Sequence, residues 1–218
     1  MLADKYCDEI SKDWLAREKD LREVDRLILR KRSDISLKSS ILISYSHWEG
    51  HFKVCADNLL EFIAEGIKRK IFSWTEVKED IRLRLLFCNY RRASISGQKH
   101  ETFLAYLNAI SEKRYSDILS AKDEIIMIDD NLNSTRAEAI CRNLGVSNSW
   151  FSSKSIIIDQ RLLDHRNCFA HGGKSLRGGG LVDFNDPHLW ACIDEVRILI
   201  RETKDNFQNC INTKCFLI

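Results

Sequence analysis

The sequence has few of the residues that interrupt helices and no segment suited to a membrane. It contains one proline and nine glycines in 218 residues, which favours long helices over a strand-rich sandwich. No apolar run approaches the length of a bilayer span, and charged residues follow Met1 almost at once, unlike a secretory signal. We therefore expect a soluble cytoplasmic protein that does not associate with a membrane.

The chain also lacks a strong excess of charge of either sign. The formal net charge is +2, with 44% hydrophobic and 30% charged residues, a balance that is ordinary for a globular protein. Bulk charge alone therefore gives no support for a nucleic-acid partner. A chain of this length can bury one substantial core, so we predict a single domain over residues 1–218.

The eight cysteines form no C-x-x-C pair and show no repeating spacing. Several occupy apolar positions of predicted helices, so we expect reduced and mostly buried thiols without a zinc site. The last four residues have the form of a prenylation box, but terminal isoleucine is unfavoured there and no polybasic stretch precedes it. Lipidation is not expected.

Apolar residues recur at helical spacing over most of the chain, which predicts an all-α protein. Long helices are expected over residues 4–32 and 36–70, the second with an unbroken core-facing stripe. That stripe comprises Ile41, Tyr45, Trp48, Phe52, Cys55, Leu59 and Phe62. The capping-box pattern at 73–76 predicts a further helix through Cys88.

The second half of the chain has the same character. Asn133 is expected to cap a short helix that stops at Gly145, and a motif helix is expected over 155–171. Asn185, Asp186 and Pro187 should begin the last helix. The remaining expected elements are a basic loop at 90–100, a helix around 103–110, a strand or buried turn at 125–128, and a mobile glycine-rich loop at 172–185. Together these elements predict an antiparallel helical bundle.

The most informative segment is residues 162–173, which places Arg166, Asn167 and His171 just before a glycine-rich loop. Arginine binds phosphate through a planar fork of N–H donors. Histidine carries a proton on and off near neutral pH, and the C-terminal end of a helix favours its cationic form. Asn167 lies four residues before His171, on the same helix face, and is expected to orient His171 or a substrate oxygen.

The segment Arg166-Asn167-x-x-Ala170-His171-Gly172 resembles the R-x4-6-H signature of the HEPN superfamily. Residues 45–53 and 132–146 are similar to segments of one bacterial branch, the MAE-type HEPN-like nucleases. This resemblance spans roughly residues 36 to 208. It implies a helical homodimer that dimerises through the bundle and cleaves RNA without a metal. It also implies a bacterial toxin–antitoxin or antiphage setting, with an antitoxin or other defence-system protein as partner.

The helix geometry is consistent with a site built from two chains. Five helical residues turn the chain by about 500°, so Arg166 and His171 point roughly 140° apart. Two such helices that face each other across a two-fold axis would bring both arginines and both histidines to one cleft. There His171 would act as base or acid, while Arg166 would stabilise the charge on the scissile phosphate.

Three other polar residues lie on the second predicted helix. Glu49 flanks the core stripe and is a candidate supporting residue that orients His171 or Arg166, as an acidic residue there does in the resembling family. The alternative is a solvated glutamate. His47 and His51 are four residues apart and could bind a metal, but no third ligand is apparent, so we expect no metal or cofactor. His165, on the inner face of the motif helix, is expected to be a hydrogen-bonded core residue.

The leading prediction is therefore a metal-independent endoribonuclease that uses Arg166, Asn167 and His171. The second is a non-catalytic HEPN-like module that binds a partner protein or a nucleotide, because a fold does not fix a function. A third is a metal nuclease based on His47, Glu49 and His51. Whether the basic segment 91–100 contacts the RNA backbone stays open.

Overall fold

The computed structural model describes residues 1–30, 32–83, 85–86, 104, 107–113, 131–172 and 180–218. Within these ranges the chain is helical and contains no strand, only one isolated bridge between Val77 and Leu217, so the all-α prediction is confirmed. The predicted basic loop at 90–100 and the apolar run at 125–128 lie outside the described residues. No helix of the described ranges is both long enough and apolar enough to cross a membrane.

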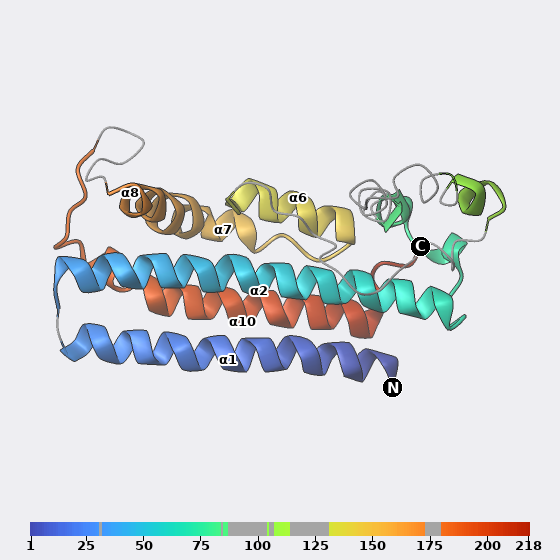
Figure 1. The fold of residues 1–218 in the computed structure, drawn as a ribbon, viewed down its shortest axis with the longest axis horizontal. Coiled ribbons are helices and arrows are strands. Elements are labelled where there is room, and N and C mark those ends of the chain that lie inside the picture. The colour runs from blue at the N-terminus through green and yellow to red at the C-terminus, as the bar shows by residue number, and fades with distance from the viewer. Residues whose placement is uncertain (31, 84, 87–103, 105–106, 114–130, 173–179) are drawn as a thin grey trace.

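Three long helices form the body of the molecule: α1 (Leu2–Arg30), α2 (Asp34–Lys68) and α10 (Cys192–Thr213). In Figure 1, α1 lies along one side of the α2–α10 pair and the helices between residues 134 and 170 lie along the other. The helix over residues 2–30 confirms the prediction for 4–32, and α2 confirms the prediction for 36–70.

The central helix α2 is buried along most of its length because its apolar stripe faces neighbours on both sides. Ser33 begins the helix through a capping box with Ser36, in which each side chain accepts the other residue's backbone N–H. Such caps satisfy backbone donors that have no partner within the helix. The apolar stripe that predicts α2 is thus also the surface against which the neighbouring helices pack.

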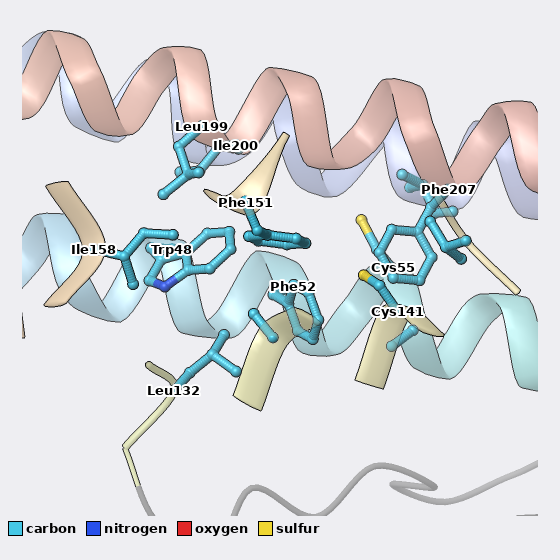
Figure 2. Close-up of a cluster of buried hydrophobic side chains, with 14 of the residues drawn as sticks. Trp48, Phe52, Cys55, Leu132, Cys141, Phe151, Ile158, Leu199, Ile200 and Phe207 are labelled. Carbon is cyan, nitrogen blue, oxygen red and sulfur yellow. The ribbon is translucent and has the colours of Figure 1, made fainter. Parts of the chain in front are cut away.

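Aromatic rings fill the space between α2, α10 and the shorter helices. Figure 2 shows Trp48 and Phe52 of α2 beside Phe151 and Phe207. Phe52 lies 5.5 Å from Trp48 and 5.7 Å from Phe207, measured between ring centroids. Tilted and edge-to-face pairs of this kind add about 0.5–1.5 kcal/mol each beyond the area they bury.

The motif helix is continuous but not uniform. It comprises α7 (Phe151–Ser155), a π-helical segment η2 (Ile156–Asp164) and α8 (His165–Ala170). It begins four residues before the predicted start at Ser155, and its middle is wound more loosely than a standard α-helix. Such π-helical turns are rare and occur often at functional sites. Gly172, at φ +68°, follows the last turn.

The two flanking helices begin and end largely where their capping residues predict. In α6 (Ser134–Leu144) the Asn133 side chain accepts the backbone N–H of Arg136, and Gly145 at φ +72° ends the helix. The predicted last helix is divided in two. Its first turn is α9 (Pro187–Trp190), capped by Asp186, and α10 starts after Ala191.

The prediction of a helix directly from the 73–76 capping box is wrong. Ser73 and Glu76 do form the box, but it caps only a 3-10 turn, η1 (Trp74–Glu76). Val77 is extended and bridges to Leu217, and the chain becomes helical again at residue 79. At Val77 the chain therefore pairs with the C-terminal segment and does not continue as a helix. That segment is held there by Phe216, whose ring packs against Phe62 and Phe72 in the core.

The expectation that every cysteine is reduced is also wrong. Cys210 and Cys215 form a disulfide that joins the last turn of α10 to the C-terminal segment. The remaining cysteines of the described residues are free thiols, and Cys55, Cys141, Cys168 and Cys192 are buried as expected. Cys88 lies outside the described residues.

Candidate functional site

Three segments that are far apart in the sequence meet on one face of α2. They are Tyr45 and Glu49 of α2, the residues Asn131 and Leu132 that precede α6, and the start of α8. Each of the three segments that carry the family resemblance contributes a polar group here. Their meeting point defines the candidate site.

Arg166 is held over the ring of Tyr45. Its guanidinium carbon lies 5.0 Å from the ring centroid, and its Nη1 donates to Oδ1 of Asn167 at 2.9 Å. Among the described residues no carboxylate pairs with Arg166, whereas Arg161 on the same helix pairs with Glu195 at 2.7 Å. The Arg166 charge is therefore positioned by a ring and an amide, which leaves it able to bind an anion.

Asn167 connects Arg166 to the segment before α6. Its Oδ1 also accepts from Nδ2 of Asn131 at 3.1 Å. Toward His171 it provides only its backbone carbonyl, which accepts the His171 backbone N–H at 3.3 Å. In this structure the Asn167 side chain therefore orients Arg166, and not His171.

Glu49 acts on this site through Tyr45. Its Oε1 accepts from the Tyr45 hydroxyl at 3.0 Å and from the backbone N–H of Leu132 at 3.2 Å. The same N–H also donates to the Tyr45 hydroxyl oxygen at 2.7 Å. Burial, together with the adjacent Glu49 carboxylate, raises the pKa of Tyr45 well above its usual value. The hydroxyl therefore stays protonated and keeps its bond to Glu49.

The segment before α6 is fastened to the motif helix by Asp159 of η2. The Asp159 carboxylate accepts the backbone N–H of Ser134 at 2.7 Å and the Ser134 hydroxyl. A carboxylate at a helix N-terminus satisfies unpaired backbone donors and complements the helix dipole. Through this contact, the π-helical segment helps to place Asn131 and Leu132 beside Arg166.

His171 stands apart from this network. It is the exposed residue at the C-terminal end of α8. The next residue, Gly172, has open space around it, since a Cβ added there would meet no atom within 4 Å. Arg166 lies in the first turn of α8 and His171 is its C-cap, five positions later. Ideal α-helix geometry turns the chain by about 500° over five residues, which corresponds to directions roughly 140° apart.

The other histidines on α2 are directed elsewhere. His51 is fully buried, with Nδ1 2.6 Å from Asp13 and Nε2 3.4 Å from the sulfur of Cys55. His47 is half-buried near Asp20 of α1. Neither shares a partner with Glu49, so the three do not converge as the metal-nuclease alternative requires. Within the described ranges no three histidines, cysteines or carboxylates are grouped as metal ligands.

His165 is half-buried, and its Nδ1 lies 2.9 Å from the backbone carbonyl of Gln160, a contact exposed to solvent. The expected core position is thus only partly realised. The sequence alone did not identify three residues as members of this site: Tyr45, Asn131 and Asp159. For Tyr45 a signal existed, because it lies four residues before Glu49 and thus on the same helix face.

Comparison with known proteins identifies the family of the chain. A family model described as RiboL-PSP-HEPN matches residues 5–209. Searches of curated proteins and of solved structures found no match. The matched range includes α1, α2, the segment before α6 and the motif helix, and thus every element of the candidate site. The chain therefore belongs to the RiboL-PSP-HEPN family of the HEPN superfamily.

Proposed function

We propose that this protein is an endoribonuclease that cleaves RNA without a metal, with Arg166, Asn167 and His171 at its active site. The observation that carries the proposal is the placement of Arg166. It is fixed on Tyr45 and Asn167, has no carboxylate partner among the described residues, and lies on the helix that ends at the exposed His171.

The chemistry requires little beyond these groups, because RNA supplies its own nucleophile, the 2′-hydroxyl. His171 removes the 2′-hydroxyl proton or protonates the leaving 5′-oxygen. Arg166 binds the scissile phosphate and stabilises the charge that develops in the transition state. The products are a 2′,3′-cyclic phosphate and a 5′-hydroxyl. Asn167, Tyr45 and Glu49 hold Arg166 in place and do not react.

The site is proposed to be composite, formed by a homodimer. Ideal helix geometry directs Arg166 and His171 of one chain to different sides of the helix, which favours a cleft that draws one of them from each of two chains. A second copy related by a two-fold axis would supply the missing partner to each. This arrangement also accounts for the exposure of His171 at the end of α8.

The biological setting is proposed from resemblance. The likeness of residues 45–53, 132–146 and 166–172 to the MAE-type branch supports a place in that branch. The setting would then be a bacterial toxin–antitoxin or antiphage system, in which an antitoxin or another defence protein restrains cleavage. The cytoplasm, where such systems meet their RNA, is the corresponding location.

The test is cleavage of a broad panel of labelled RNAs in the presence of EDTA. The wild type should cut, and both His171→Ala and Arg166→Ala should not. Mixing the two inactive variants should restore partial activity, since a mixed dimer holds one intact arginine and one intact histidine in a shared cleft. Absence of cutting by the wild type would favour the binding-module alternative, and cutting that EDTA abolishes would contradict the proposed mechanism.

A further inference from the structure

A second group of cations rests on aromatic rings at the end of the bundle where α8 stops. The guanidinium carbon of Arg32 lies 4.5 Å from the ring centroid of Trp190. The Nζ of Lys38 lies 5.4 Å from the ring of Phe184 and 5.8 Å from that of Phe169. We call Arg32, Lys38, Phe184 and Trp190 the cation–aromatic patch.

The patch continues the line of contacts that starts at Arg166. Lys38 and Tyr45 are seven residues apart on α2, and so they share a face about 10 Å apart along the helix. On α8 the residues facing them are Phe169 and Arg166, in the same order. His171 follows Phe169 by two residues, so the exposed histidine lies at the end of α8 nearest the patch.

The aromatic rings of the patch are held in place and remain partly open. Phe184 stacks on Phe169 with ring centroids 6.2 Å apart, and the Trp190 indole N–H donates to the backbone carbonyl of Phe184 at 2.8 Å. Both Phe184 and Trp190 are half-buried. Rings fixed in this way lose little freedom when a flat group stacks on them.

The cations of the patch are not neutralised by acidic side chains. Among the described residues neither Arg32 nor Lys38 pairs with a carboxylate, whereas Arg197 pairs with Glu18 on the long helices. The nearby carboxylate of Asp186 caps α9 by accepting the backbone N–H of His188. The patch therefore presents positive charge together with aromatic surface.

We infer that the cation–aromatic patch binds the nucleotides of single-stranded RNA that flank the cleaved linkage, an inference that rests on the proposed function. Sequence-tolerant binding of single strands combines cations that follow the phosphates with rings on which bases stack. Arg32 and Lys38 supply the first, and Trp190 with Phe184 supplies the second. The strand would run from Arg166 past His171 to the turn between α1 and α2.

The experiment measures binding by fluorescence anisotropy, with a labelled single-stranded oligouridine and protein that carries His171→Ala to prevent cleavage. In this background Arg32→Gln with Lys38→Gln should lower the slope of log affinity against log salt by about 1.4, since each phosphate contact to a single strand contributes about 0.7. Trp190→Leu should weaken binding roughly fivefold or more through lost stacking. Lys12→Gln with Lys19→Gln, exposed on α1, changes the net charge equally and should leave the slope as it was.

Three outcomes would overturn the inference. Unchanged affinity and slope in the Arg32/Lys38 variant, while the wild type cuts RNA, would overturn the patch and leave the proposed function standing. An equal decrease of the salt slope in the Lys12/Lys19 control would show that the effect comes from the net charge of the protein and not from the patch. A wild-type chain that neither binds nor cuts RNA would overturn both proposals. A thermal melt of each variant shows whether the fold is retained, which is needed because Lys38 and Trp190 are half-buried.

Discussion

Replacing Tyr45 by phenylalanine isolates the contribution of one hydroxyl group to the candidate site. This hydroxyl accepts the backbone N–H of Leu132 at 2.7 Å and donates to Glu49 at 3.0 Å. Phenylalanine removes both bonds but keeps the ring on which Arg166 rests. The substitution therefore separates the attachment of the segment before α6 from the support of the guanidinium.

The expected loss is moderate, because only part of the network disappears. The Leu132 N–H keeps its bond to Glu49 at 3.2 Å, while the half-buried carboxylate loses one of its donors. Two hydrogen bonds are lost, and each contributes about 0.5–1.5 kcal/mol net. The ring contact, worth about 0.5–2 kcal/mol, should persist in Tyr45→Phe and be lost in Tyr45→Leu. We therefore expect Tyr45→Phe to be destabilised by about 1–3 kcal/mol, and Tyr45→Leu by more.

Denaturant unfolding measures the stability, and single-turnover RNA cleavage measures the effect on the site. Tyr6 provides a matched control, since its buried hydroxyl donates to Glu65 at 2.5 Å toward the other end of α2. Tyr6→Phe should also lower stability but leave cleavage unchanged, whereas Tyr45→Phe should slow cleavage about tenfold if 1.4 kcal/mol of positioning is lost. A Tyr45→Phe protein as stable and as active as the wild type would refute this account of the network.

Two further predictions concern the body of the bundle. Gly66→Ala should cost about 1–3 kcal/mol in denaturant unfolding, because the new Cβ would lie 2.2 Å from the Phe72 ring, whereas Gly180→Ala, with open space around it, should be neutral. Burial lowers the pKa of His51 in the folded chain. Below about pH 6.5, His51 therefore binds a proton in the unfolded chain but not in the folded chain. The free energy of unfolding should then fall as the pH drops through that region, by at most about 1.4 kcal/mol per pH unit. In urea melts from pH 7 to 5, His51→Gln should make the stability depend less on pH. The control is His188→Gln, at an exposed histidine. The assignment would be contradicted if His51→Gln left the pH dependence unchanged, or if His188→Gln changed it equally.

The sign of the His51 effect follows from its neighbours. The Asp13 carboxylate, 2.6 Å away, is already balanced by Arg17 at 2.7 Å. The hydrogen bonds from His51 and Arg17 outweigh the opposing effect of burial and lower the pKa of Asp13. A proton on His51 would therefore leave an excess positive charge in the interior, with Lys204 also opposing it. This is why burial prevails over the attraction of a single adjacent carboxylate.

The long helices could be predicted from the sequence because their apolar residues repeat over many turns. The stripe from Ile41 to Phe62 defines α2, and capping residues such as Asn133 and Gly145 locate the ends of α6. Both signals are local, so neighbouring residues alone carry the information.

The errors arise where apolar spacing and capping residues carry no signal. Val77 leaves the predicted helix because it pairs with Leu217, far away in the sequence. Cys210 and Cys215 are only five residues apart, but they meet through a reversal of the chain at Lys214, in a left-handed conformation. The loose winding of η2 likewise leaves no mark in the apolar spacing.

The candidate site divides in the same way. Arg166, Asn167 and His171 could be selected because they form one short motif on one helix. The groups that orient Arg166 come from α2 and from the segment before α6, and contacts such as that of Asp159 with Ser134 span 25 residues. Sequence reasoning could therefore name the reactive groups but not the framework that positions them.

The π-helical winding between Ile156 and Asp164 sets the rotational phase of everything that follows it. Each residue of an α-helix turns the chain by about 100°. A π-helical turn holds one residue more than an α-helical turn, because its hydrogen bonds span five residues and not four. Deleting one residue from the loose segment would therefore let it tighten to an ordinary α-helix with Arg166 still over Tyr45. Inserting a residue that the segment does not absorb would instead turn Arg166 by about 100° and take it off that ring.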